Sequence, residues 1–199
     1  MAVTLNASTS TGYIQTADTS GDLAIQSNGT TQFNVTSTGA YGQIKSGTAV
    51  TTTSGTSVDF TSIPSWVKRI TVMLSNVSTA ASNANALVRI GYTGAVESTG
   101  YNCNYIQTNG SSTFALANIT NGLNLGFISN AANNMVAVGT LTLVGSNIWT
   151  YSANCVENAA TRAFITTGSI TLSGTLNILS VVLTSSTFDA GTINILYEG

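Results

Sequence analysis

Seven carboxylates are the side chains through which this chain could carry out acid–base chemistry. They are Asp18, Asp22, Asp59, Glu97, Glu157, Asp189 and Glu198. A glycosidase needs two carboxyl groups about 5 to 10 Å apart. Three of the seven stand in turn sequences, where Asp bonds to the local backbone, and one is the next-to-last residue. Asp59, Glu97 and Glu157 remain, and no spacing brings them together. We predict that the protein is not an enzyme; a glycan-cleaving enzyme is the disfavoured alternative.

Nucleophilic and metal chemistry is restricted by the absence of histidine. A Ser-His-Asp triad needs histidine as its base, so this mechanism is excluded. A zinc site would have only Cys103 and Cys155 together with carboxylates, which is an unusual ligand set. We therefore expect no metal and no cofactor. In a cytosolic product the two cysteines are expected to be free, partly buried thiols rather than a disulfide.

Aromatic side chains among small polar residues are the remaining candidates for binding. Tyr101 and Tyr105 lie in the stretch 91–105 (GYTGAVESTGYNCNY), and Trp149 and Tyr151 form a second cluster. We predict these four as receptor-binding residues, because Tyr and Trp offer rigid amphipathic faces beside adaptable hydrogen bonds. The alternative is that the rings are buried in a sandwich core or in a trimer interface, where Tyr and Trp are also common.

The composition narrows the class of protein. Of the 199 residues, 43% are hydrophobic and 6% are charged, so the chain lacks both marks of disorder, low hydrophobicity and high charge. The five Lys and Arg residues are scattered and the net charge is −2, which argues against binding to nucleic acid. No apolar run approaches the length of about 20 residues that spans a membrane, and no secretory signal is visible. We expect a cytosolic product without membrane insertion, whose nearly neutral surface favours self-association.

Residues 46–199 are predicted to form an antiparallel β-sandwich, arranged like a jelly roll. Pro64 marks the start of the strongest strand, 66–74, whose apolar side chains from Trp66 to Leu74 share one face. Further strands alternate with turn residues at intervals typical of an all-β domain. They are predicted at 86–92, 113–119, 123–128, 135–144, 147–151, 162–166, 169–172, 176–183 and 192–197.

The predicted strand 176–183 is apolar on both faces. Ile178 and Val182 lie on one face, and Leu179 and Val181 lie on the other. One face can pack into the core of the domain. The other must be covered by a loop or by another subunit.

Residues 1–45 are predicted to be a separate β segment that has no core of its own. The Asn28-Gly29 dipeptide between two short apolar runs predicts a hairpin, because the central residues of such a turn need positive φ. An isolated hairpin is marginally stable in water, and no amphipathic helix is near enough to cover it. Its apolar side chains must therefore be covered from outside the hairpin. These side chains are Leu23, Ile25, Phe33 and Val35.

Three stretches resemble parts of a known class of protein. The first, 19–30 (TSGDLAIQSNGT), is similar to the Ser-Gly-Asn/Asp-Leu-x-Leu-Gln-x-Asn-Gly repeat of fibrous segments in bacteriophage tail fibres and related virion proteins. The others, 62–72 (SIPSWVKRITV) and 187–198 (TFDAGTINILYE), resemble the start and the end of a β-rich C-terminal domain on such proteins. Together they bracket nearly the whole chain, although residues 1–45 are a much shorter fibrous part than these fibres usually have.

The resemblance implies a structural protein of the virion, made in the host cytoplasm and assembled as a homotrimer. The four apolar side chains of the hairpin are then expected to face a three-fold axis or a neighbouring subunit. The alternative is that they fold back onto their own C-terminal domain. The N-terminal segment would bind other virion proteins, and the C-terminal domain would contribute to recognition of a glycan or protein on the host surface. The nearest rival is a trimeric capsid decoration protein, for which a short stalk would suffice.

Overall fold

The computed structural model describes residues 23–27, 30–36, 39–41, 44–108, 110, 114–159 and 161–199. These residues form seventeen β-strands and no helix, so the predicted all-β class is confirmed. The chain divides into two compact units, Met1–Gln43 and Ile44–Gly199. The sequence places this boundary two residues later, after residue 45, but β4 (Ile44–Ser46) pairs with the last strand of the second unit.

The first unit contains a three-stranded antiparallel sheet in the order β1-β2-β3. Its strands are β1 (Leu23–Ser27), β2 (Thr30–Thr36) and β3 (Gly39–Tyr41). Ser27 pairs with Thr30, so two residues connect β1 and β2, as expected for a tight hairpin. Leu23 lies opposite Val35, and Ile25 lies opposite Phe33, so the four predicted apolar positions share one face.

The larger sheet of the second unit has the strand order β11-β10-β15-β14-β13-β7-β17-β4, and β5 also pairs with β17. Its further strands are β5 (Val50–Thr51), β7 (Arg69–Thr79), β10 (Asn102–Thr108), β11 (Phe114–Ile119), β13 (Met135–Gly145), β14 (Ile148–Glu157), β15 (Arg162–Thr171) and β17 (Phe188–Glu198).

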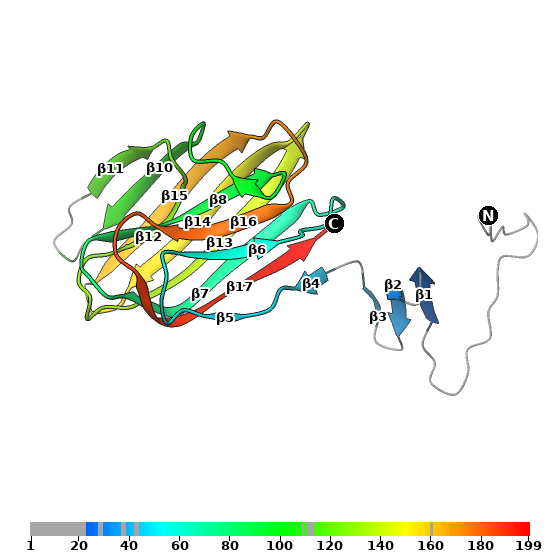
Figure 1. Ribbon diagram of the computed structural model, residues 1–199, viewed down its shortest axis with the longest axis horizontal. Coiled ribbons are helices and arrows are strands. Elements are labelled where there is room, and N and C mark those ends of the chain that lie inside the picture. Colours follow the sequence, from blue (N-terminus) through cyan, green and yellow to red (C-terminus); the bar gives the residue numbers. More distant parts are fainter. Residues whose placement is uncertain are drawn as a thin grey trace, which may run out of the picture. The chain divides into compact units, whose positions relative to one another are not determined.

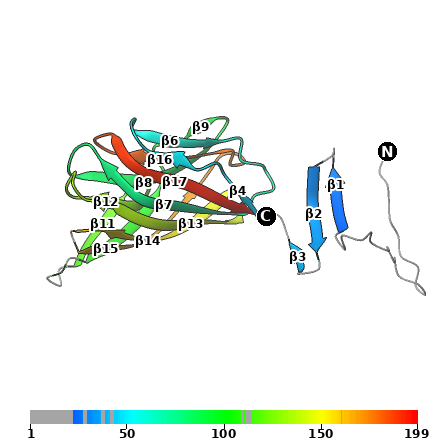
Figure 2. The same ribbon diagram turned by 90° about the horizontal axis from the view of Figure 1, so that it is seen from below.

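The smaller sheet has the strand order β12-β8-β16-β6, and β9 pairs with the end of β8. Its strands are β6 (Ser57–Thr61), β8 (Ala84–Tyr92), β9 (Ala95–Val96), β12 (Leu123–Ile128) and β16 (Ile178–Leu183). The two sheets lie face to face, as Figures 1 and 2 show from two directions. The predicted antiparallel β-sandwich is therefore confirmed.

Strands that are far apart in the sequence pair in a nested order. β7 pairs with β17, β8 with β16, and β10 with β15. This wrapping is like that of a jelly roll, with the hairpin of β13 and β14 inserted between β15 and β7. Since each nested pair joins distant residues, the positions of the side chains depend on the complete fold and not on local sequence.

The sandwich has two ends, which differ in the chain segments and loops located there. Ile44 pairs with Glu198, so the start of this unit lies beside the end of β17, at what we call the proximal end. The loops between β7 and β8, β12 and β13, β14 and β15, and β16 and β17 lie at the opposite, distal end (Figure 1).

The core is formed by alternate side chains on the facing surfaces of the two sheets. β14 shows the alternation over its whole length, because every second residue from Trp149 to Glu157 is buried and the residues between them are exposed. In β7 the predicted inward residues from Ile70 to Leu74 are buried, whereas Trp66 precedes the strand and is half-buried. Alternation thus identifies the core wherever the strand is identified correctly.

Two strand predictions differ from the structure. Residues 162–171 are one continuous strand, β15, where the sequence predicts two shorter ones. Residues 102–108 form β10 inside the larger sheet, although the sequence predicts a surface-exposed stretch there. For the doubly apolar strand β16, Ile178 and Ser180 on the outer face are buried within the same chain, and Val182 is half-buried.

Candidate partner-binding surfaces

Tyr101 lies inside the sandwich and ties two segments together. Its side chain is 3% exposed. Its hydroxyl oxygen accepts a hydrogen bond from the Ile90 N–H at 2.9 Å and lies 3.1 Å from the Glu97 carbonyl oxygen, to which it can donate. Burial raises the pKa of Tyr101 to about 12. These contacts fix the segment after β9 against β8, and they leave the ring unavailable to a receptor.

Trp149 and Tyr151 point into the core from β14. They are 2% and 3% exposed, and neither the Trp149 Nε1 nor the Tyr151 hydroxyl has a hydrogen-bond partner. Burial raises the pKa of Tyr151 well above its ordinary value. Tyr105 on β10 is half-buried, and its ring lies 6.0 Å from that of Phe164.

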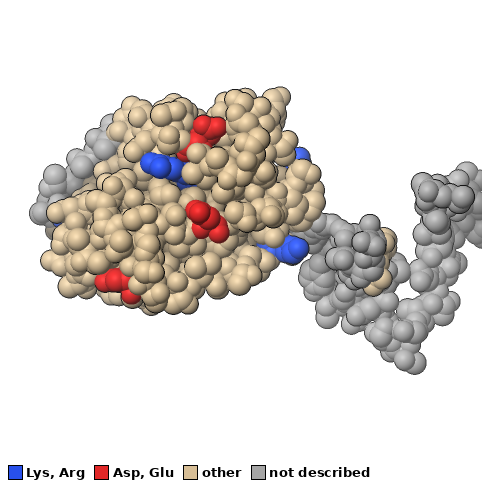
Figure 3. All heavy atoms as spheres, viewed as in Figure 1, with Lys and Arg blue, Asp and Glu red and all other residues tan. Residues whose placement is uncertain are grey.

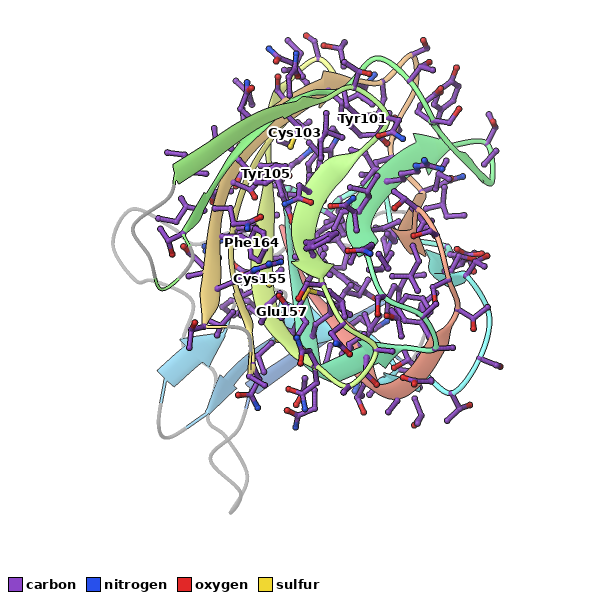
Figure 4. The ribbon with its side chains drawn as sticks, turned by 90° about the vertical axis from the view of Figure 1, so that its left-hand side faces the viewer. Tyr101, Cys103, Tyr105, Cys155, Glu157 and Phe164 are labelled. Carbon is purple, nitrogen blue, oxygen red and sulfur yellow. The ribbon has the colours of Figure 1, made fainter. Side chains whose placement is uncertain are left out.

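The predicted aromatic binding surface is therefore wrong for Tyr101, Trp149 and Tyr151, whose rings belong to the core. Figure 4 shows Tyr101, Cys103, Tyr105, Phe164, Cys155 and Glu157 along the space between the two sheets. The physical reason is strand pairing. β14 pairs on both sides inside the larger sheet and turns Trp149 and Tyr151 inward, and Tyr101 directly precedes β10, which pairs with β15 and turns Cys103 inward. Alternation of Tyr101, Cys103 and Tyr105 with Asn102 and Asn104 is the signal in the sequence that indicates this strand.

The predicted interface residues of the first unit have the geometry of an uncovered apolar face. Ile25 is 53% exposed and its cross-strand partner Phe33 is 37% exposed. The backbones of Leu23 and Val35 are paired next to them, but the side chains of these two residues lie outside the described part of the structure. A large aliphatic and an aromatic side chain thus meet on one side of a three-stranded sheet and remain in contact with solvent.

Glu157 is the one carboxylate that lies fully inside the sandwich, within the part of the chain that the structure describes. Its Oε1 accepts three hydrogen bonds, from the Ser129 N–H at 2.5 Å, the Ser129 hydroxyl at 2.7 Å and the Asn133 Nδ2 at 2.9 Å. Its Oε2 has no hydrogen bond and forms an ion pair with Arg162 at 3.7 Å. The guanidinium of Arg162 lies over the ring of Phe127, 5.9 Å from its centre. The carboxylate anchors the distal loop between β12 and β13.

The three carboxylates left by the sequence lie on or directly after different strands of the sandwich. Glu157 ends β14 at the distal end, whereas Glu97 follows β9 and donates its backbone N–H to the Ile90 carbonyl. Asp59 lies on β6 and accepts a hydrogen bond from the Ser180 hydroxyl. Neither a hydrogen bond nor an ion pair joins any two of them in the described residues. The described residues also contain no cluster of three His, Cys, Asp or Glu side chains that could hold a metal ion.

Cys103 and Cys155 are free thiols, both buried, as the sequence predicts. Burial raises the pKa of both, and that of Cys155 reaches about 12, to which the nearby Glu157 also contributes. The thiol, and not the reactive thiolate, is therefore the form present at neutral pH.

A groove of about 390 Å³ runs along the seam between the edges of the two sheets. The segment from β4 to β5 forms one wall and β6 forms the other. The groove is lined by hydroxyl-bearing and charged side chains together with apolar ones. The lining residues include Lys45, Ser46, Thr48, Asp59, Phe60, Thr61, Ile63, Ile195 and Tyr197. The ring of Tyr197 is half-buried and lies 5.9 Å from that of Trp66. This groove, which we call the seam groove, has the size and mixed polarity of a site for a small polar ligand.

Charge is sparse on the surface of the second unit. Figure 3 shows a few charged side chains on the face that it views, separated by wide uncharged areas. The described residues contain two ion pairs, Arg69 with Glu198 and Arg162 with Glu157. Long-range electrostatic attraction therefore contributes little to the choice of a partner, and shape and apolar contact must decide it.

Comparison with known proteins leaves the family open. The chain matches no protein-family model, and no curated protein matches it. In the described residues there is no helix long and apolar enough to cross a membrane.

Proposed function

We propose that this chain is a structural protein of a bacteriophage virion that works as a homotrimer, in a tail fibre or another tail-associated appendage. The observation that carries the proposal is the exposed Ile25–Phe33 pair on the three-stranded sheet of the first unit. The resemblance of 19–30 to a fibrous repeat and of 62–72 and 187–198 to a C-terminal fibre domain supports the same conclusion. In this proposal the first unit also attaches the protein to other virion proteins.

The physical reason is that three short strands cannot cover both faces of their own sheet. A sheet of this size is marginal in water unless its apolar face packs against something. The first unit, Met1–Gln43, is also close to the size below which a domain rarely buries a sufficient core. Three identical copies can bury Ile25 and Phe33 against each other around one axis, because each copy offers the face that the others lack.

The assembly is tested by the mass of the purified full-length protein in solution. Light scattering during size-exclusion chromatography should give three times the chain mass of 20.4 kDa. The variant Ile25→Ser/Phe33→Ser should have a larger dissociation constant than the original chain, because it removes the apolar contacts of the first unit. It should therefore already be dissociated at protein concentrations at which the original chain is still a trimer. Its sandwich should unfold at an unchanged temperature, since the second unit is separate. A stable monomer at all concentrations would contradict the proposal.

The location on the particle is tested by counting copies. An appendage protein occurs in a few to some tens of copies per particle, whereas a capsid decoration protein, the alternative function, occurs in hundreds. Quantitative mass spectrometry of purified particles, with the major capsid protein as internal standard, distinguishes the two. Complete absence from the particles would reject both.

Recognition of the host surface is the task that we propose for the second unit, through the seam groove. Lys45 lies at its rim and has no ion-pair partner among the described residues, so its ammonium is available to an acidic sugar. Saturation-transfer NMR should show binding of glucuronic acid in preference to glucose. Lys45→Ala should abolish the preference, whereas Lys68→Ala, which removes an exposed lysine outside the groove, should keep it. Equal or absent binding of the two sugars would reject this task for the groove.

A further inference from the structure

The outer face of the larger sheet carries apolar side chains in two adjacent rows across its distal half. In each row the residues lie directly opposite one another on neighbouring strands. We call these the outer apolar rows. One row consists of Val136, Val156 and Ala163, and the other of Met73, Val138, Asn154, Ile165 and Ile106. These positions point away from the core, because their neighbours along each strand are buried.

The side chains of the outer apolar rows are open to solvent. Ile165 is 60% exposed, Val156 is 54% exposed and Val138 is 48% exposed. A strand that faces water normally carries polar residues on that side. The next two rows toward the proximal end fit this rule, since they are mainly Thr, Ser and Asn. They include Thr71, Thr140, Ser152, Thr167 and Asn104, and then Thr142, Thr150, Ser169 and Asn102.

The apolar half of this face is also hollowed. A depression of about 420 Å³ is lined by residues of β13, β14 and β15, with Asn154 and Ala163 as small side chains beside the larger Val136, Val138 and Ile165. A protruding aliphatic side chain such as Ile165 and a hollow of this kind are complementary shapes on one surface. The face thus offers both protruding aliphatic side chains and a hollow to the larger sheet of a neighbouring copy.

No charged residue belongs to the outer apolar rows or to the row of Thr140. The charged residues on this face lie outside these rows: Arg69 and Glu198 at the proximal end, and Asp189, which accepts a hydrogen bond from the Ser78 hydroxyl, at the distal end of β17. Within the rows an identical copy can thus approach without like-charge repulsion, and a partner selected by charge would find no charge there to pair with.

The face is large enough for a stable contact. With strands about 4.8 Å apart and a rise of about 3.4 Å per residue, the seven strands from β11 to β17, which are six to eleven residues long, cover about 1,000 Å². This area includes the outer apolar rows in the distal half and the hydroxyl-rich rows beside them. A standard protein interface buries about 800 Å² on each partner. An exposed apolar patch that is rimmed by hydroxyl groups is typical of such an interface.

We infer that the outer face of the larger sheet is a second self-association surface, and that its occupants are the larger sheets of the neighbouring copies of this chain around a three-fold axis. The inference rests on the proposed homo-oligomer for the identity of the partner, but not on its place in a virion. The sandwich unit then contributes to assembly itself, in addition to the contact made by the first unit.

Charge introduced into the outer apolar rows of the full-length protein tests the inference. Val138→Lys/Ile165→Lys should raise the dissociation constant of the oligomer at least about 100-fold, because each contact then juxtaposes like charges. The matched control Ser54→Lys/Ser57→Lys adds the same two positive charges at exposed positions in and just before β6 and should leave the constant unchanged. Val138→Thr keeps the branched shape of the side chain and should weaken association by a smaller factor. The measurement is light scattering over a dilution series, with circular dichroism melting to show that each variant is folded.

The outcomes separate this inference from the proposed function. If Val138→Lys/Ile165→Lys and Val138→Thr associate like the original chain while Ile25→Ser/Phe33→Ser dissociates, the second surface is rejected and the proposed trimer stands. If both face variants dissociate but the protein is absent from virus particles, the surface is supported and the virion function is rejected. A full-length protein that is monomeric at all concentrations overturns the second surface.

Discussion

Removal of the buried Glu157 carboxylate should strongly destabilise the sandwich. In Glu157→Ala, the Ser129 N–H, the Ser129 hydroxyl and the Asn133 amide lose their common acceptor, and Arg162 loses its counter-ion. Each unsatisfied buried donor costs about 1–3 kcal/mol, and loss of one partner of a buried ion pair costs about 3–5 kcal/mol. The donors are partly buried and the Arg162 side chain is 27% exposed, so water offsets part of these costs. We expect a loss of about 3–5 kcal/mol in the free energy of unfolding.

Two matched variants separate the hydrogen bonds from the charge. Glu157→Gln keeps an oxygen that can accept from Ser129 but removes the charge opposite Arg162, so we expect a loss of about 1–2 kcal/mol. Glu198→Gln removes the carboxylate of the exposed ion pair with Arg69 and should cost less than about 1 kcal/mol.

The assay is urea unfolding at one fixed protein concentration, because association also contributes to apparent stability. With a slope of about 2–3 kcal/mol per molar urea, Glu157→Ala should lower the midpoint by about 1–2.5 M. A midpoint within about 0.3 M of that of the original chain would refute the reasoning. It would mean that water replaces the carboxylate as the acceptor for the distal loop.

Two further predictions concern alkaline pH and the buried thiols. The folded-state pKa values of Cys155 and Tyr101 are raised to about 12 from ordinary values of 9.0 and 10.0, so their stabilising contribution is complete below about pH 9 and is lost as the pH rises toward 12. Between pH 8 and pH 10.5, ionisation of Cys155 alone should lower the free energy of unfolding by about 2 kcal/mol, as measured by urea unfolding. Cys155→Ala should remove this part of the pH dependence. A midpoint of unfolding that does not change with pH would contradict the raised pKa of Cys155. At pH 8 a maleimide should label neither Cys103 nor Cys155 in the folded protein and both in urea, as read by mass spectrometry, whereas rapid labelling of the folded protein would show that the core opens.

The strands of the sandwich were predictable where one face of the strand is buried and the other is exposed to solvent. In β13 and β14 the alternation of apolar and polar side chains is a direct result of the pleat, so it can be recognised in the sequence without the fold. The hairpin of the first unit was predictable for a similar local reason, since the register of Ile25 with Phe33 follows from a two-residue connection.

The candidate binding residues were not predictable in the same way. The stretch around Tyr101 combines Tyr, Asn, Gly and Thr, which is typical both of recognition loops and of strands with a polar outer side. Only the pairing of β10 with β15 decides between these, and it joins residues about 60 positions apart in the chain. The outer apolar rows escaped prediction because β13, β14 and β15 each contribute only one or two apolar outward residues. No single strand shows the patch.

The sequence by itself determined the all-β class and the division into a short N-terminal segment and a sandwich, because composition, turn residues and side-chain alternation act locally. Tertiary structure alone decided that Trp149 and Tyr151 are core residues, that Glu157 anchors a distal loop, and that exposed valines and isoleucines meet on one face. The physical reason is the nested strand pairing: the neighbours of each side chain come from distant parts of the chain, and their contacts exist only once both sheets are complete.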